Sequence, residues 1–180
     1  MEGHERIRLF VALRLPDATV ERLSAWQHAE LDGAPDARIV PPGNLHVTLA
    51  FLGSRPVEDV EPILGLLREL APNAERPLLA AGAYRETRSV GMVRLEDEGE
   101  RATRFAGRVG EGLERLGVYE RERRTWLPHV TVLRFRRPPR LRPAPPDLGR
   151  FSPSEVALYH SVLRPTGAQY EVVESIPLGG

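Results

Sequence analysis

The stretches NLHVTLAFLG, residues 44–53, and PHVTVLRF, residues 128–135, repeat one pattern: histidine, an apolar residue, threonine, an apolar residue. The chain has only five histidines, and two of them stand in this pattern 83 residues apart, His46 and His129. Both stretches are rich in β-branched and apolar residues and favour strands. Residues two apart on a strand point to the same face, so each pattern predicts a histidine and a threonine projecting together.

If the two strands border one cleft, two imidazoles and two hydroxyls converge there. Imidazole has an ordinary pKa close to neutrality, so one ring can give a proton while the other takes one. Threonine hydroxyls can donate hydrogen bonds to phosphate oxygens as charge redistributes. The repeated pattern therefore predicts phosphodiester chemistry that proceeds without a metal ion. The residues alone leave open which histidine is the acid and which is the base.

Composition excludes several other chemistries. The chain has no cysteine, which rules out disulfides, thiol nucleophiles and cysteine metal sites. No third ligand has telling spacing to His46 or His129, so we expect neither a metal nor another cofactor. The sequence contains no P-loop, no G-x-S-x-G and no Rossmann glycine pattern, which argues against an ATP-driven ligase. Apolar runs are too short to span a bilayer and the N-terminus is charged, so we expect a cytoplasmic protein without membrane contact.

Positive charge is concentrated in one part of a chain whose net charge is zero. Residues 119–150 carry nine arginines against three acidic residues, and the whole sequence contains no lysine. Such an excess is typical either of a surface that meets an anionic partner or of a solvated, proline-spaced segment.

The order of apolar patterns predicts an α+β fold in a single domain spanning residues 1–180, with helices packed outside antiparallel or mixed sheets. Strands are expected at 6–15, in a short edge segment before residue 40, at 46–52, 78–84, 89–95 and 128–135, and in a hairpin around 165–167. Helices are expected at 17–31, 54–70 and 100–116, the second kinked or delayed by Pro62. Asp17 and Ser54 are the expected caps of the first two helices.

Within these helices, apolar spacing predicts the buried faces. The residues expected there are Val20, Leu23, Trp26 and Ala29; then Val57, Val60, Ile63, Leu64 and Leu67; and finally Phe105, Val109, Leu113 and Leu116. The proline-rich segment after residue 135 is expected to be a long loop.

HVTL at 46–49 and HVTV at 129–132 resemble the paired H-x-T-x signatures of the 2H phosphoesterases, and more closely the bacterial and archaeal RNA 2′,3′-cyclic phosphodiesterases, historically called 2′-5′ RNA ligases. RLFVALRLP near the N-terminus and the closing hairpin extend this resemblance over almost the whole chain. It implies a bilobal fold with a central cleft, pseudo-twofold symmetry and one motif in each lobe. The implied activity opens a terminal 2′,3′-cyclic phosphate to a 2′-phosphomonoester.

The resemblance also implies the role of each site residue. His46 is the proton donor and His129 the proton acceptor, Thr48 and Thr131 bind phosphate oxygens, and Arg134 adds a charged contact. Arg134 follows His129 by five positions, so an ideal strand would turn it to the opposite face, and we expect a β-bulge or strong twist there. Phe51 holds the matching position in the first motif; it could stack a base, but its apolar neighbours Leu49 and Leu52 favour a place in the core.

Other hypotheses keep part of this interpretation. The substrate could be a small cyclic phosphate, such as a nucleoside or ADP-ribose cyclic phosphate, instead of an RNA end, and 2′-5′ ligation could accompany either as the reverse reaction. A non-catalytic RNA-binding module is the third hypothesis. We expect a monomer with no obligatory protein partner. Of the remaining histidines, His4 is expected in a mobile terminus, His28 facing solvent, and His160 has no assigned role.

Overall fold

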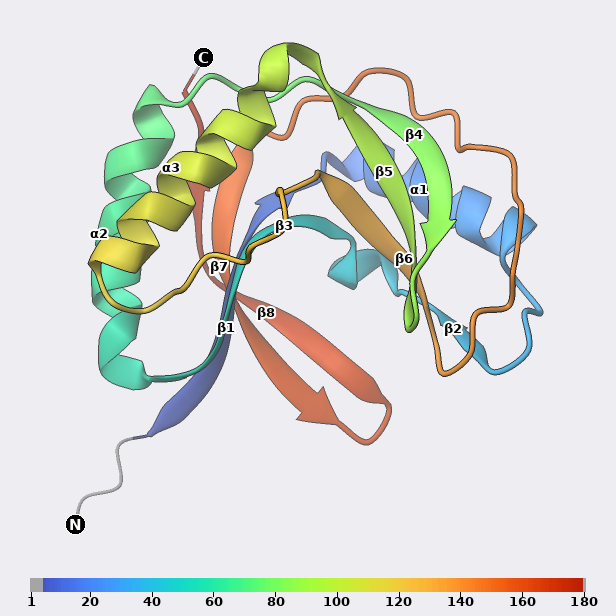
Figure 1. Cartoon of the computed structure of the whole chain (residues 1–180), viewed down its shortest axis with the longest axis horizontal. Helices are drawn as coiled ribbons and strands as arrows, with labels where there is room; N and C mark the ends of the chain where they lie inside the picture. The colour runs from blue at the N-terminus through green and yellow to red at the C-terminus, as the bar shows by residue number, and fades with distance from the viewer. Residues whose placement is uncertain (1–4, 180) are drawn as a thin grey trace.

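Eight strands in residues 5–179, the part of the chain that the computed structural model describes, form two separate four-stranded sheets (Figure 1). His4 lies outside the described residues. The first sheet has the order β3-β1-β7-β8 and the second has the order β2-β6-β5-β4, with every neighbouring pair antiparallel. The strands are β1 (Arg6–Arg14), β2 (Ala37–Ile39), β3 (His46–Pro56), β4 (Leu79–Glu86), β5 (Val90–Asp97), β6 (His129–Phe135), β7 (Glu155–Arg164) and β8 (Gly167–Pro177). This confirms the α+β class and makes both sheets antiparallel instead of mixed.

Helices cover the outside of the two sheets. Helix α1 (Asp17–Glu30) packs against the second sheet, where the buried Gln27 donates from Nε2 to the backbone oxygen of Val132 on β6 at 2.8 Å. Helices α2 (Val60–Leu70) and α3 (Arg101–Arg115) lie side by side on the first sheet (Figure 1). A Cβ at Gly112 would collide with the Leu66 side chain, so this glycine permits their close approach.

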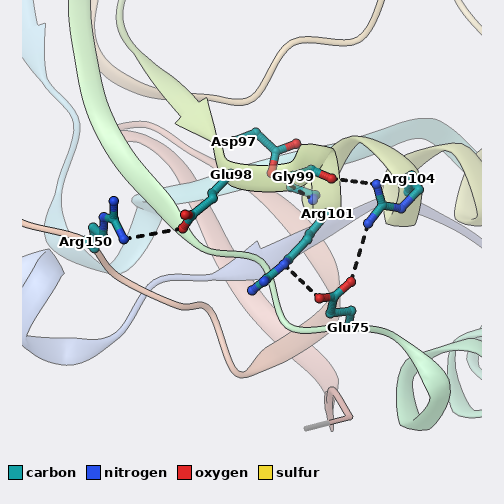
Figure 2. A network of polar contacts seen from close by, with 8 residues as sticks. Glu75, Asp97, Glu98, Gly99, Arg101, Arg104 and Arg150 are labelled. Carbon is teal, nitrogen blue, oxygen red and sulfur yellow. Dashed lines mark hydrogen bonds and ion pairs between the residues drawn. The ribbon is translucent and has the colours of Figure 1, made fainter.

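The beginning of α3 is fixed by a polar network that includes three separate segments (Figure 2). The Asp97 carboxylate accepts hydrogen bonds from the backbone N–H groups of Ala102 at 3.0 Å and Thr103 at 2.8 Å, which satisfies donors that have no partner inside the helix. Arg104 reaches back to Glu75, in the connection between α2 and β4. The network's other ion pairs join Arg101 to Glu75 and Arg150 to Glu98. Ion pairs at this helix start therefore hold two loops: Arg101 and Arg104 bind Glu75 of one loop, and Glu98 binds Arg150 of the other.

The proline-rich loop after β6 has no regular structure in residues 136–150, as the sequence predicts. It is nevertheless held in place. Glu86 at the end of β4 accepts from the backbone N–H groups of Arg140 and Leu141, and the indole of Trp26 donates to the Ala144 oxygen at 2.8 Å. The loop therefore runs along the outer side of the second sheet.

One hydrophobic cluster joins the two sheets. It contains buried residues from β1 and β3 of the first sheet, from β5 and β6 of the second, and from all three helices. Val11, Val47 and Val132 in this cluster are fully buried. The sheets therefore share one core, which places the inner ends of β3 and β6 close together.

Several sequence-based details were wrong at the helix starts. Pro16 holds the N-cap of α1 and Asp17 lies inside the first turn without a capping hydrogen bond. Ser54 belongs to β3, so it caps no helix. Helix α2 begins only at Val60, after a short 3₁₀ turn, because Pro62 is tolerated in a first turn but not further inside a helix.

The predicted buried faces also need correction. Val57 and Leu116 are 39% and 41% exposed because both lie beyond the ends of their helices. Ala29 is exposed, and Gln27 is buried in the face of α1 that packs on the sheet. Gln27, a polar residue that donates hydrogen bonds to backbone oxygens, therefore occupies part of the helix face that was expected to be apolar.

Candidate active site

The two H-x-T-x motifs stand on different sheets. His46 begins β3, an edge strand of the first sheet, and His129 begins β6, which lies between β2 and β5 in the second. His46 Nε2 lies 2.8 Å from Thr48 Oγ1, which confirms that these two side chains share a face of β3. Between His129 and Thr131 the pairing with β5 is regular, so they too share a face.

A direct hydrogen bond connects the motifs. Trp126, three residues before His129, donates its indole N–H to the backbone oxygen of Thr48 at 3.1 Å. This bond ties the segment that leads into β6 to the first motif. It is a contact that the sequence pattern did not predict.

His46 lies in an environment that opposes its protonation. Its ring packs against Phe10 at 4.9 Å between centroids, and against Tyr170 at 5.5 Å and Tyr159 at 5.8 Å. Burial is the largest cause that lowers the pKa of His46 from 6.5 to about 4. The backbone of Asn44 opposes this shift, although His46 Nδ1 makes no hydrogen bond of good geometry.

Two charged residues also lower the pKa of His46. After burial and the Asn44 backbone, Arg134 and His129 are the next causes, and each lowers the pKa of His46 by charge repulsion. Both residues therefore lie within electrostatic reach of His46. The structure thus brings together the two histidines and the arginine singled out from the sequence. In the ligand-free protein at neutral pH, His46 is an uncharged imidazole.

His129 is oriented by its own backbone. Its Nδ1 lies 2.9 Å from the Leu127 oxygen. A carbonyl oxygen can only accept, so Nδ1 carries the proton and Nε2 of the neutral ring keeps its lone pair. This tautomer can take a proton from a group in the cleft.

A register shift in β6 explains how Arg134 reaches the face of the strand that carries the motif side chains. On β6, Thr131 pairs with Met92 and Leu133 pairs with Gly91, so Val132 has no partner on β5. Val132 and Leu133 are both buried, and the alternation then resumes with Arg134 exposed. The expected bulge is present, and it returns Arg134 to the face of the strand that carries Thr131.

The first motif contains the same irregularity. Thr48 pairs with Ala12 and Ala50 with Val11, which leaves Leu49 without a partner. Leu49 and Ala50 are both buried, and Phe51 turns outward with 62% of its surface exposed. The prediction that Phe51 belongs to the core was therefore wrong, because the bulge reverses the alternation on which that prediction rested.

A cavity of about 550 Å³ opens beside the aromatic rings that contact His46, and the two motif histidines are not among its lining residues. Phe10 and Tyr170, whose rings touch His46, line it together with Phe51 and Arg134. Arg134 Nη2 donates to the Tyr170 hydroxyl at 3.4 Å, which holds the guanidinium against β8. Arg8 of β1, Arg38 of β2 and the turn between β7 and β8 form other parts of the wall.

The arginine-rich segment contributes less to the site than its charge suggests. Of the nine arginines in residues 119–150, Arg134 alone lines the cavity. Arg121 pairs with Glu111 and Glu114, and Arg150 pairs with Glu98, so acidic residues elsewhere in the chain neutralise part of the excess.

The remaining predictions concern the other histidines, metal binding and membrane-spanning helices. His28 is exposed on α1, as predicted. His160 of β7 pairs with Leu9 of β1. It follows Tyr159 directly, so its side chain points to the opposite face of the strand, away from the cavity. Across residues 5–179, no group of three or more histidine, aspartate or glutamate side chains is arranged to hold a metal ion. Nor does any helix in that range have the length and apolarity to cross a bilayer.

Comparison with known proteins agrees with this arrangement. The model of the family described as LigT like Phosphoesterase matches residues 13–91, which include the first motif. An RNA 2′,3′-cyclic phosphodiesterase of Thermus thermophilus is 33% identical over 186 positions, covering 97% of this chain and 91% of that protein. A crystal structure of a Thermus thermophilus protein is similar with a TM-score of 0.84 and 30% identity, over 97% of this chain and 99% of that one. Escherichia coli LigT, solved with 3′-AMP, has the same fold with a TM-score of 0.83 and 22% identity, over 98% and 100% of the two chains.

Proposed function

Because the chain belongs to the LigT-like phosphoesterase family, we propose that it hydrolyses the terminal 2′,3′-cyclic phosphate of RNA to a 2′-phosphomonoester without a metal ion. The name of the Thermus thermophilus relative supports this reaction. The observation that carries the proposal for this chain is the pair of H-x-T-x motifs on β3 and β6, with His46 and His129 within electrostatic reach of each other.

In the proposed mechanism, His129 is the proton acceptor. Its Nε2 takes a proton from water, and the water oxygen attacks phosphorus. The hydrogen bond from Nδ1 to the Leu127 oxygen supports this role, because it fixes the ring and stabilises the imidazolium that forms. The bond from phosphorus to the 3′ oxygen breaks as the new bond forms.

His46 is the proton donor to the departing 3′ oxygen. Its proton must be present in the complex, although the free protein favours the neutral ring. The negative phosphate supports protonation, since it offsets the repulsion from Arg134 and His129 and favours a positive charge beside it. Thr48, Thr131 and Arg134 bind the phosphate oxygens, and Arg134 counters the charge that develops on them.

We further propose that the protein is one 2H phosphoesterase domain with two pseudo-symmetric lobes, and that it acts as a monomer in the cytoplasm. One chain supplies both motifs, and the matching bulges after Thr48 and Thr131 support a relationship between the two halves.

The decisive experiment is hydrolysis of a short oligonucleotide that ends in a 2′,3′-cyclic phosphate, in EDTA, with 2′- and 3′-phosphate products resolved. We expect the 2′-phosphate alone. His46→Ala and His129→Ala should each lower kcat/KM by roughly 10²–10⁴-fold. The matched control is His28→Ala, since His28 is an exposed histidine on α1. Activity that survives in both site variants, or a 3′-phosphate product, would contradict the proposal.

The separate roles of the histidines can be tested with a nitrophenyl phosphodiester. Nitrophenolate leaves without protonation, so loss of the donor should matter far less with this substrate. We expect His46→Ala to lose no more than about ten-fold and His129→Ala to lose its full factor of roughly 10²–10⁴. The reverse pattern would exchange the two roles.

A further inference from the structure

Two arginines face each other across neighbouring strands next to the site. In the pairing of β2 with β6, Arg38 lies directly opposite Arg134, and both line the cavity. Like charges in this position destabilise a sheet. An anion bound between the two guanidinium groups would remove that cost.

A third arginine approaches from the other sheet. Arg8 lies two positions before Phe10 on β1 and lines the same cavity. Within residues 5–179, the side chain of Arg8 has no ion-pair partner, and the backbone of Arg8 pairs with Ser54 of β3. None of the described side chains that line the cavity is acidic.

Several arginines elsewhere in the protein form ion pairs with carboxylates. Arg68 pairs with both Glu61 and Glu174, and Arg121 pairs with Glu111 and Glu114. The cavity thus concentrates three guanidinium groups, and its described lining includes no carboxylate. This pattern is typical of a site whose counter-charge is supplied by a ligand.

The turn of the β7–β8 hairpin completes the far wall of the cavity. Arg38 Nη1 donates to the Thr166 oxygen at 3.3 Å, and Asn44 Nδ2 donates to the Ala168 oxygen at 3.0 Å. These bonds join the hairpin of the first sheet to β2 and to the loop before β3. The space beyond Arg134 is therefore bounded by both sheets and partly open to solvent, with the exposed ring of Phe51 on its wall.

We propose that Arg8 and Arg38 bind the phosphodiester one nucleotide upstream of the cyclic phosphate, so that the preferred substrate is an RNA end of two or more nucleotides. Arg134 contacts the reacting phosphate, and the guanidinium groups of Arg38 and Arg8 contact the next one. Phe51 offers a face on which a base stacks without hydrogen-bond readout. This inference rests on the proposed function and adds its substrate class.

The test compares two substrates, adenosine 2′,3′-cyclic phosphate and a trinucleotide with the same cyclic end. For wild type we expect a higher kcat/KM on the trinucleotide. Arg8→Gln and Arg38→Gln should each lower kcat/KM on the trinucleotide by about ten-fold or more and leave the mononucleotide within about two-fold. The matched control is Arg108→Gln, an exposed arginine on α3 outside this cavity.

Salt dependence can be measured on the wild-type protein, so this test does not require that a variant folds. Each phosphate contact on a single strand contributes about 0.7 to the slope of log(kcat/KM) against log[salt]. Wild type should therefore show a slope steeper by about 0.7 on the trinucleotide than on the mononucleotide, because one further phosphate is contacted, and each variant should reduce that difference. Equal slopes, or variants that affect both substrates alike, would overturn the upstream phosphate site. A wild-type protein that hydrolyses neither substrate would instead overturn the proposed function.

Discussion

His46 illustrates how the immediate surroundings of one side chain can set its chemistry. Aromatic rings from β1, β7 and β8 pack around the imidazole and remove it from water, and this burial is the main reason that its pKa falls to about 4. The charges of Arg134 and His129 act in the same direction. The negative charge of a bound phosphate would oppose them, so substrate binding and protonation of His46 are coupled.

The low pKa of His46 predicts an unusual acid limb in the pH profile of kcat/KM. This parameter reports ionisation of the free enzyme. The state in which both histidines carry a proton is inactive, because His129 can then accept none. It forms only as pH falls through about 4, so activity should persist well below the pKa of 6.5 that an ordinary histidine has. An acid-side decline centred near pH 6.5, with folding intact by circular dichroism, would contradict this assignment.

Sequence analysis identified the residues of the two motifs but missed those around them. His46, Thr48, His129 and Thr131 could be found because the pattern repeats and strand periodicity fixes their faces. Phe10 and Tyr170 carry no such signal, because an aromatic residue in an apolar strand is typical of an ordinary core. Their contact with His46 depends on the antiparallel pairing of β1 with β3 and β7 and on the turn of the last hairpin, which are long-range properties.

At the scale of elements, the bulges decide which side chains reach the site. The unpaired Leu49 in β3 and the unpaired Val132 in β6 each reverse the alternation within their motif. The sequence could show that Arg134 needed such a bulge, but it held no independent sign that one was present. The same uncertainty led to the wrong prediction for Phe51. A bulge is set by strand pairing, and local propensity does not encode it.

Gln27 joins helix α1 to β6 and to the residue that follows β2, and this predicts its contribution to stability. Its Nε2 donates to the oxygens of Val40 and Val132, at 3.1 and 2.8 Å. Gln27→Leu keeps the volume but removes the donor, so we expect the free energy of unfolding to fall by about 1–2 kcal/mol in urea denaturation. The same change at Gln169, the chain's other glutamine and an exposed one, should stay within about 0.5 kcal/mol. Equal effects at the two positions would contradict the bridging role.

At the scale of the whole molecule, the main hydrophobic cluster draws on both sheets, and a small second cluster of Phe10, Ala12, Ala157 and Tyr159 belongs to the first sheet. Apolar periodicity predicted the class and order of the elements well, because each strand and helix buries one face. It could not predict which strands pair across the chain. The meeting of β1 with β7, and of β2 with β6, joins segments more than 90 residues apart.

The common core predicts a single cooperative unfolding transition. Far-ultraviolet circular dichroism and tryptophan fluorescence should give the same midpoint in urea, and the calorimetric and van't Hoff enthalpies should agree. Two resolved transitions would show instead that the halves fold as independent units.

Arg134 also affects the step after bond cleavage. The cyclic diester carries one negative charge, whereas the monoester carries nearly two at neutral pH. Arg134, with no carboxylate in the described cavity lining to compete for it, should therefore hold the product more strongly than the substrate. Progress curves should slow well before substrate is exhausted, and added 2′-phosphorylated oligonucleotide should inhibit with a Ki below KM. Product release would then be the rate-limiting step. Turnover would be fastest where a second enzyme removes the 2′-phosphate that this reaction forms.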